Sequence, residues 1–223
     1  MNAECQPRTG EDAHERSVSP QQRRLVDAFL AFSGKIGEDS ILEVVRTGAR
    51  AGSHACVSAR ASKVENACKS SAQQHDAKKA MTFDVRHLPF SDGEFDWVFC
   101  ADVIEHAGGF ERQYDMLKEL TRVARRGVFL TTRNRWHPLE SNTGLLFLHW
   151  LPAAWWRRIL KLTGKTEWSG ESALNLLDAG ALQKLASFLP GRLTYDIGHV
   201  RRNGIKAHFF LQLRKKLPAK PEA

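Results

Sequence analysis

The chain has 223 residues, a length that suits one globular domain with some decoration. Its net charge of +8 fits a solvated basic surface, an anionic substrate or a membrane headgroup surface, and without a recognition motif beside the charge a nucleic-acid partner is not expected. The polar N-terminus lacks the apolar core of a signal peptide, no apolar stretch is long enough to span a bilayer, and the four cysteines fit no metal-binding spacing, so we expect a cytoplasmic protein without a metal site.

The sequence predicts one folded domain, at 19–213, between two tails. Residues 1–18 are polar and mixed in charge, which favours disorder, and residues 214–223 are expected to form a basic tail. The domain opens with Ser19-Pro20, which predicts the start of a helix because Ser caps well and Pro suits the first helical position. Gly34 is expected to end this helix.

The apolar run from Ser40 to Val45 predicts a buried parallel strand, and the stretch after it breaks the pattern. Arg46 to Lys79 contains no Leu, Ile, Phe, Trp or Tyr, and its only β-branched aliphatic residues are Val57 and Val64. Glu65, the nearest acid, lies in no recognisable strand. Because so few apolar residues cannot bury the face of a helix or strand, we expect this segment to be poorly ordered.

Beyond residue 80 the alternation of strands and helices returns. The apolar run from Phe95 to Ala101 is too short for a helix and predicts a strand. Phe110 to Val123 has helical spacing, with Gly127 expected to end the helix, and Asn203-Gly204 predicts a hairpin turn. The remaining expected elements are a strand at 128–132, a helix that Pro152 starts, a helix that Asp178 caps and that ends at Ala186, and strands at 193–197 and 207–213.

The stretch from Asp84 to His106 reads DVRHLPFSDGEFDWVFCADVIEH and resembles the class I methyltransferases that use S-adenosylmethionine (SAM), especially the small-molecule branch. In that family an acid follows the third strand, a D-G-x-F-D run opens the fourth, and a D-x-x-E-H stretch comes after it. The resemblance covers about residues 41–213. It implies an α/β fold with a doubly wound, mostly parallel seven-stranded sheet and a C-terminal antiparallel hairpin.

The resemblance also implies a cofactor site for SAM. Asp84 would meet the adenine amino group, with the backbone of Val85 alongside, and Asp102 would face the methionine part. Glu43 holds the acid position of the first strand, and Gly48 would belong to the loop after it. Two of these residues have a simpler interpretation, since Asp84 is also suited to an Asx turn and Asp102 to a helix N-cap.

Glu105 and His106 are the candidates for acid–base chemistry. A histidine has a pKa near neutrality, so His106 could take a proton from an acceptor hydroxyl, or it could only order the loop. Asp102, Glu105 and His106 also resemble a metal-binding stretch of some quinone O-methyltransferases, but three residues are too few to predict a metal.

The glycine-rich loop of the family is missing from its expected place. Val45, Thr47 and Ala49 stand where glycines are expected, and Gly48 and Gly52 are out of register. A segment of preserved length and lost pattern suggests a stretch read in a shifted frame, and the alternative is a divergent insertion. The chain could therefore be a catalytically inactive relative that serves as a binding module.

The segment from Trp136 to Arg158 combines aromatic and basic residues after the fifth strand, where the family places substrate-selecting insertions. It could cover a lipid-like or glycolipid acceptor, make a peripheral membrane contact through Leu145 to Arg158, or be an ordinary buried helix. It looks like a stretch found in methyltransferases of polysaccharide and cell-envelope gene clusters. We therefore expect methyl transfer to an oxygen of a small-molecule or envelope-linked acceptor, with a membrane-surface binding protein as a further alternative.

Overall fold

The computed structural model describes residues 19–34, 39–46, 63–69, 81–82, 84–139, 144–170 and 173–216. Their helices and strands, in chain order, are α2 (Pro20–Ser33), β1 (Ser40–Arg46), β2 (Lys63–Lys69), β3 (Met81–Thr82), β4 (Phe95–Ala101), the short 3-10 helix η1 (Ile104–His106), α4 (Phe110–Val123), β5 (Ala124–Arg133), the 3-10 helix η2 (Leu148–Trp150), α5 (Ala153–Leu162), the 3-10 helix η3 (Thr166–Trp168), α6 (Ala179–Ser187), β6 (Leu193–Arg202) and β7 (Ile205–Lys215).

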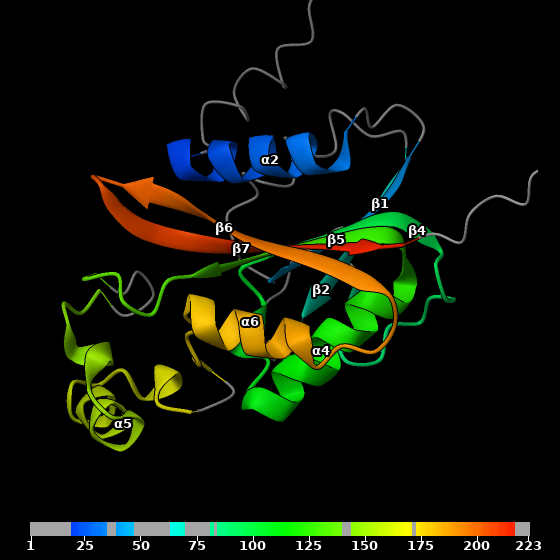
Figure 1. Ribbon diagram of the computed structural model, residues 1–223. Helices are drawn as coiled ribbons and strands as arrows, with labels where there is room; N and C mark the ends of the chain where they lie inside the picture. Colours follow the sequence, from blue (N-terminus) through cyan, green and yellow to red (C-terminus); the bar gives the residue numbers. More distant parts are fainter. Residues whose placement is uncertain are drawn as a thin grey trace, which may run out of the picture.

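The strands form one sheet in the order β3-β2-β1-β4-β5-β7-β6. The pairs from β3 to β5 are parallel, whereas β7 is antiparallel to both β5 and β6. Helix α2 covers one face of the sheet, and α4 and α6 cover the other (Figure 1). The α/β Rossmann-like fold with a C-terminal antiparallel hairpin is thus confirmed, although β3 contributes only two residues.

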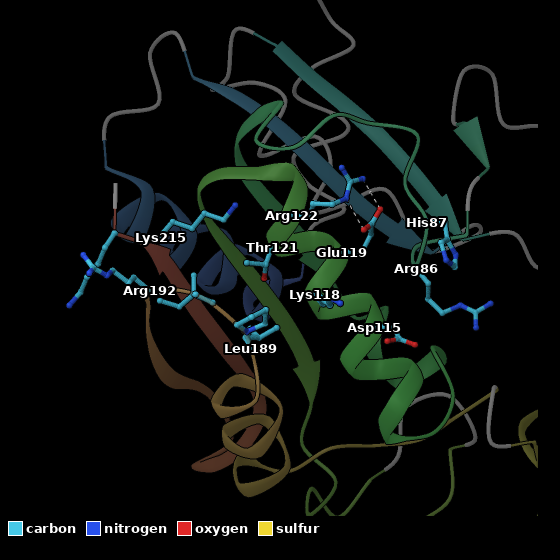
Figure 2. Close-up of a pocket in the computed structure, with 14 residues that line it drawn as sticks. Arg86, His87, Asp115, Lys118, Glu119, Thr121, Arg122, Leu189, Arg192 and Lys215 are labelled. Atoms are coloured by element: carbon cyan, nitrogen blue, oxygen red, sulfur yellow. Dashed lines mark hydrogen bonds and ion pairs between the residues drawn. The ribbon is translucent and has the colours of Figure 1, made fainter. Parts of the chain in front are cut away.

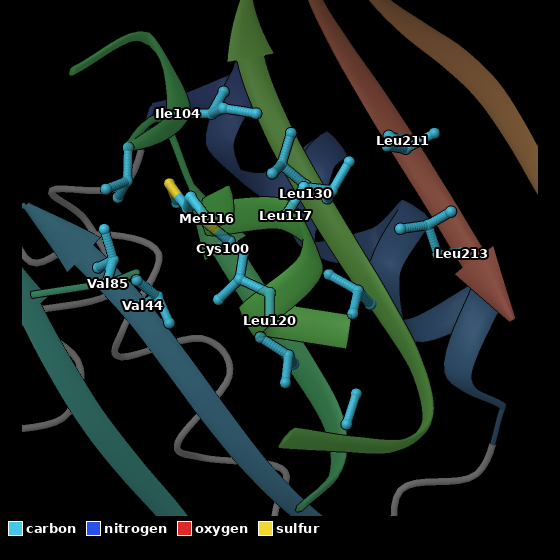
Figure 3. Close-up of a cluster of buried hydrophobic side chains, with 14 of the residues drawn as sticks. Val44, Val85, Cys100, Ile104, Met116, Leu117, Leu120, Leu130, Leu211 and Leu213 are labelled. Carbon is cyan, nitrogen blue, oxygen red and sulfur yellow. The ribbon is translucent and has the colours of Figure 1, made fainter. Parts of the chain in front are cut away.

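The two faces of the sheet carry separate hydrophobic cores. Strand β4 supplies both, because its side chains alternate: Val98 and Cys100 point toward α4, and Trp97 and Phe99 point toward α2. Figure 3 shows the larger core, on the α4 side. A strand buried on both faces reads as a continuous apolar run, which explains why β4 was predictable from the sequence.

Two helix N-caps and one hairpin turn are formed by the residues that the sequence predicts for them. The Ser19 hydroxyl accepts a hydrogen bond from the Gln22 N–H at 3.2 Å, and the Gln22 side chain accepts one from the Ser19 N–H at 3.1 Å. Asp178 caps α6 by accepting a hydrogen bond from the Ala181 N–H. Asn203 and Gly204 have φ angles of 50° and 80°, which suits the tight turn between β6 and β7. All three predictions are confirmed.

The interpretation of Gly127 as the end of a helix is wrong. Helix α4 passes into β5 at Ala124, and Gly127 lies inside that strand. A Cβ atom at this position would lie 2.3 Å from the backbone oxygen of Leu213, on the neighbouring strand β7. The close approach of β7, and not a helix cap, therefore requires glycine here.

Replacing Gly127 by Ala should lower the free energy of unfolding by about 1–3 kcal/mol, because β7 must shift to make room for the methyl group. Urea unfolding would measure the change. Gly180→Ala in α6 is the matched control: its Cβ would meet only the Asp178 side chain, at 3.4 Å, so it should keep or raise stability. A Gly127→Ala variant as stable as the natural chain would contradict this account.

Strand β2 corrects one expectation about the segment at 46–79. Glu65 does lie in a strand, since Lys63–Lys69 pairs in parallel with β1 and places Glu65 beside Leu42. Whether such a segment forms a strand depends more on pairing with an adjacent strand than on local propensity. The rest of that segment and the tail at 1–18 lie outside the described residues. At the other end, β7 continues through Lys215, so the first residues of the expected basic tail belong to the sheet.

Candidate active site

The carboxyl ends of the parallel strands β4 and β5 bring polar side chains to one edge of the sheet. Asp102 directly follows β4, and Arg133 is the last residue of β5. Antiparallel pairing places His208 of β7 opposite Arg133. Glu105 joins them from η1. We refer to Asp102, Glu105, Arg133 and His208 as the edge cluster; in open α/β sheets this edge is where ligands bind.

Asp102 is held in an unusual backbone conformation. Its φ angle is 51°, in the left-handed region that residues other than glycine seldom adopt. The Thr131 hydroxyl donates a hydrogen bond to its carboxylate at 2.9 Å, and its own N–H donates to the Thr131 backbone oxygen at 3.2 Å. No side chain caps η1, so the N-cap interpretation of Asp102 is wrong. Strain of this kind is frequent at functional sites.

Two cations face the Asp102 carboxylate. The nearest nitrogen of His208 lies 3.5 Å from it and that of Arg133 lies 3.8 Å away. Burial alone would raise the pKa of Asp102, but the charges of His208 and then Arg133 outweigh it and hold the pKa well below its usual range. Conversely, burial would lower the pKa of His208, and Asp102 raises it above the usual value. Asp102 is therefore an ionised acceptor at neutral pH.

Glu105 has the opposite electrostatic character. Its side chain is fully buried, and one carboxyl oxygen accepts a hydrogen bond from the Thr132 hydroxyl at 2.9 Å. Within the described residues the other oxygen, Oε1, has no hydrogen-bond partner. Burial, followed by the charge of Asp102, raises the pKa of Glu105 to about 7. A carboxyl group with this pKa can give or take a proton near neutral pH.

His106 does not join the edge cluster, although it follows Glu105 in the sequence. Its Nδ1 contacts the backbone oxygen of Ala173, and its ring centroid lies 6.1 Å from that of Trp168. Because Nδ1 faces a carbonyl oxygen, Nδ1 carries the proton and Nε2 is the basic nitrogen. The two candidate acid–base residues thus point to different surroundings: Glu105 toward β5 and His106 toward the segment after α5.

Asp84 lies apart from the edge cluster in a turn after β3. Arg86 donates to both carboxylate oxygens, with a shortest distance of 2.6 Å, and its N–H donates to Oδ1 at 3.1 Å. The hydrogen bond from the Arg86 side chain lowers the pKa of Asp84 to about 2. The Asx-turn interpretation is therefore realised, while Asp84 itself stays exposed. Val85 is buried in the larger core.

The remaining predicted cofactor residues are on β1 and beyond it. Glu43 is fully buried in the middle of β1, where it neighbours Asn66 and Phe99 in the adjacent strands. The strand continues to Arg46, so Glu43 lies inside the sheet and not at its end. Gly48 lies outside the described residues.

Two members of the edge cluster were missed by the sequence analysis. The polar run Thr131-Thr132-Arg133 at the end of an apolar strand was a usable signal, because polar residues at carboxyl ends of strands often contact ligands. His208 gave no such signal, since only the register between β5 and β7 places it opposite Arg133. In the described part of the chain, no group of three or more His, Cys, Asp or Glu side chains could hold a metal ion.

A cavity among the described residues lies away from the edge cluster. It has a volume of about 660 Å³ and lies between α4, the start of β6 and the end of β7 (Figure 2). Its lining is mainly basic, with Arg86, Lys118, Arg192 and Lys215 among the residues around it. Lys215 is two residues beyond Leu213, which neighbours the start of β5, so this cavity is at the opposite end of the strands from Asp102.

Comparisons with known proteins agree with this fold. Residues 41–132 match the family model of a methyltransferase domain, which includes most of the sheet and the stretch from Asp84 to His106. No curated protein sequence matches the chain. The resemblance to methyltransferases that use SAM is thus confirmed over these residues.

Solved structures share the fold at low sequence identity. A SAM-dependent methyltransferase from Mesorhizobium loti has 10% identity and a TM-score of 0.57, covering 92% of this chain and 100% of that one. A protein from Rhodobacter sphaeroides described as a Zn-dependent alcohol dehydrogenase has 13% identity and a TM-score of 0.61, covering 90% and 91%. Geranyl diphosphate C-methyltransferase from Streptomyces coelicolor A3(2) has 14% identity and a TM-score of 0.54, covering 87% and 77%. At such identities these similarities show the fold alone.

Proposed function

We propose that this chain, whose residues 41–132 match a methyltransferase domain, transfers a methyl group from SAM to an oxygen of a small-molecule or envelope-linked acceptor. The observation that carries the proposal is the separation of two carboxyl pKa values at the carboxyl edge of β4. There Asp102 is ionised, and burial raises the pKa of the nearby Glu105 to about 7. Neighbouring carboxyl groups with separated pKa values are typical of sites that bind with one group and move protons with another.

The described carboxylates fit the chemistry of SAM, which presents an amino group, a ribose and an adenine amine as hydrogen-bond donors. Asp84 and Asp102 are both ionised acceptors, and both lie on the carboxyl side of the strands they follow. They would hold the adenine and methionine parts respectively, with Val85 beside the adenine. Glu43 and Gly48 would complete the site.

The acceptor side of the site would be formed by Glu105 and His106. SAM supplies a methyl group on a positively charged sulfur, so orientation of the acceptor oxygen contributes much of the rate. His106 would take the proton that the acceptor hydroxyl loses, because the contact of its Nδ1 with Ala173 leaves Nε2 as the basic nitrogen. Glu105 would supply a carboxyl group with a pKa of about 7 at the neighbouring edge of the sheet.

Binding of S-adenosylhomocysteine, measured by calorimetry, tests the proposal. Because the first loop lacks the family's glycines, we expect weak binding, with a Kd above roughly 100 µM. Asp84→Ala should weaken binding by about tenfold, or 1–2 kcal/mol, through loss of a hydrogen-bond acceptor. Asp92→Ala is the matched control, since Asp92 is also an exposed acid paired with an arginine. Equal losses in both variants would contradict the adenine role of Asp84.

The sequence favours one other function, that of a catalytically inactive binding module. Val45, Thr47 and Ala49 in place of glycines would crowd the cofactor in a site of the family type. Absence of any binding heat at millimolar S-adenosylhomocysteine, from a chain shown to be folded, would support this module and reject methyl transfer.

A further inference from the structure

Exposed hydrophobic side chains gather in one part of the chain. We refer to residues 144–170, which contain α5 between η2 and η3, as the arm; in Figure 1 the arm projects away from the sheet. Among the eleven large hydrophobic side chains that are exposed in the described residues, six belong to the arm: Leu146, Phe147, Trp150, Leu151, Trp155 and Leu162. The adjacent Trp136 is also exposed. A patch of this kind marks an interaction surface.

The exposure is not a sign that the arm is unfolded. Trp156 and Leu160 are buried and form a small core with Leu174, which the neighbouring Leu148 and Trp168 extend. Helix α5 therefore has two apolar sides, and only one of them packs into this core. Trp155 and Leu162, which are 64% and 81% exposed, are seven residues apart and so lie on one face, two turns from each other.

The charged residues in and just after α5 are basic. Arg157, Arg158, Lys161 and Lys165 lie in or just after α5, and the one acid in the sequence of the arm, Glu167, lies in η3. A helix with Trp and Leu on one face and Arg and Lys beside it is suited to the boundary of a bilayer, where the rings enter the acyl region and the cations meet anionic headgroups. A protein surface would need its own acids to meet these cations, whereas anionic lipid supplies them at any position.

The segment that follows the arm contacts the candidate active site. The Asn175 N–H donates a hydrogen bond to the Glu105 backbone oxygen at 2.7 Å, and the His106 ring lies near Trp168. The Arg135 N–H, two residues after the end of β5, donates to the Leu177 backbone oxygen at 2.9 Å, so the segments before and after the arm meet beside the sheet. An arm lying on a surface would therefore bring the carboxyl edge of the sheet close to that surface.

We propose that the arm docks the protein on bilayers that contain anionic phospholipid, and so presents the carboxyl edge of the sheet to acceptors carried on a lipid. The docking itself follows from the arm alone, and the statement about acceptors rests on the proposed methyl transfer. No helix among the described residues is long and apolar enough to cross a membrane. Contact would therefore be made in the plane of the interface, by the exposed face of α5.

Vesicle sedimentation with the full chain tests the docking. The probes are vesicles of phosphatidylcholine alone and vesicles in which about a third of the lipid is phosphatidylglycerol. We expect binding to the second kind, reduced by added salt, because Arg158 and Lys161 are exposed and salt screens their attraction to the lipid. Trp155→Ser with Leu162→Ser should weaken binding at least tenfold, and Lys161→Gln should weaken it about fivefold on anionic vesicles.

Two controls keep the outcome clear. Phe188→Ser removes an exposed hydrophobic side chain outside the arm and should leave vesicle binding unchanged. Trp156→Ala should unfold the arm and serves only to show what misfolding looks like in the circular dichroism spectrum. The double variant must keep the spectrum of the natural chain.

Three results would overturn the proposal. The first is no binding to the anionic vesicles at low salt, and the second is equal binding by the natural chain and the double variant. The third is a dimer in gel filtration that the double variant abolishes, while neither the natural chain nor the variant binds vesicles. The last would assign the face to a second copy of the chain. Vesicle binding together with failure to bind S-adenosylhomocysteine would keep the docking surface and reject only the methyl transfer.

Discussion

Glu105→Gln should remove most of the pH dependence of stability between about pH 4.5 and pH 7. Burial, then the charge of Asp102, raises the pKa of Glu105 from its ordinary 4.5 to about 7 in the folded chain. The folded state therefore holds this proton more tightly than the unfolded state does. The stability that the proton contributes is complete below pH 4.5 and is lost as the pH rises through about 7. A shift of this size corresponds to about 3 kcal/mol.

Urea unfolding at several pH values between 4 and 8 would measure the effect. The free energy of unfolding of the natural chain should fall across this range by more than that of the variant, and Gln can still accept the hydrogen bond from Thr132. Glu111→Gln is the control, because Glu111 is exposed in the first turn of α4. If both variants follow the natural chain at every pH, Glu105 is not the buried acid described here.

His208 contributes to the pH dependence above pH 6.5, where its range overlaps the upper end of the Glu105 range, so the two must be separated. Asp102 raises its pKa above the usual 6.5, so its contribution to stability is complete below that value and is lost as the pH rises through the folded pKa. The two residues therefore act in the same direction, and only the difference between the natural chain and Glu105→Gln isolates the glutamate. In His208→Gln, the pH dependence of the free energy of unfolding that remains should come from Glu105. The same variant tests whether Asp102 needs a cationic neighbour.

The parts of the fold that could be predicted from the sequence are those that local chemistry decides. Strand β4 was visible because a strand covered on both faces must be apolar throughout, and α6 because Asp178 precedes an apolar helical pattern. Gly127 was misassigned for the opposite reason. Its requirement for glycine comes from the backbone of Leu213, which is distant in the sequence and reaches it only through the pairing of β5 with β7.

The candidate site divides in the same way. Asp102 and Glu105 were predictable, since acids after a buried strand lie at the edge where ligands bind. Their environments were not, because Arg133 and His208 arrive by strand register and lower the pKa of Asp102, whereas burial and the charge of Asp102 raise the pKa of Glu105. Similarly, the sequence placed Glu105 beside His106, whereas the tight turn of η1 sends their side chains to different partners.

His106→Ala should lower the turnover of methyl transfer by about 10²-fold and leave the affinity for S-adenosylhomocysteine unchanged. The His106 ring faces Ala173 and Trp168, beside the arm, and not the edge cluster around Asp102. Loss of a proton acceptor there would affect only the step in which the acceptor hydroxyl is deprotonated. A residue that merely orders the loop would give a much smaller loss.

Transfer of label from [methyl-³H]SAM to the lipid fraction of an envelope extract would measure turnover, with exposed His87→Ala as the control. The pH profile then separates the two candidate bases. If His106 takes the proton, Glu105→Gln should keep most of the rate, because the imidazole base is still present. If Glu105 takes the proton of the acceptor hydroxyl, Glu105→Gln should lose most of the rate. Its pH–rate profile should also lose the midpoint near pH 7, since the pKa of Glu105 is about 7 and Gln cannot titrate. A loss of cofactor affinity in His106→Ala as large as in Asp84→Ala would contradict the assignment of His106 to the acceptor and Asp84 to the cofactor. It would mean that η1 supports the whole carboxyl edge of the sheet, so that neither His106 nor Glu105 acts on the acceptor alone.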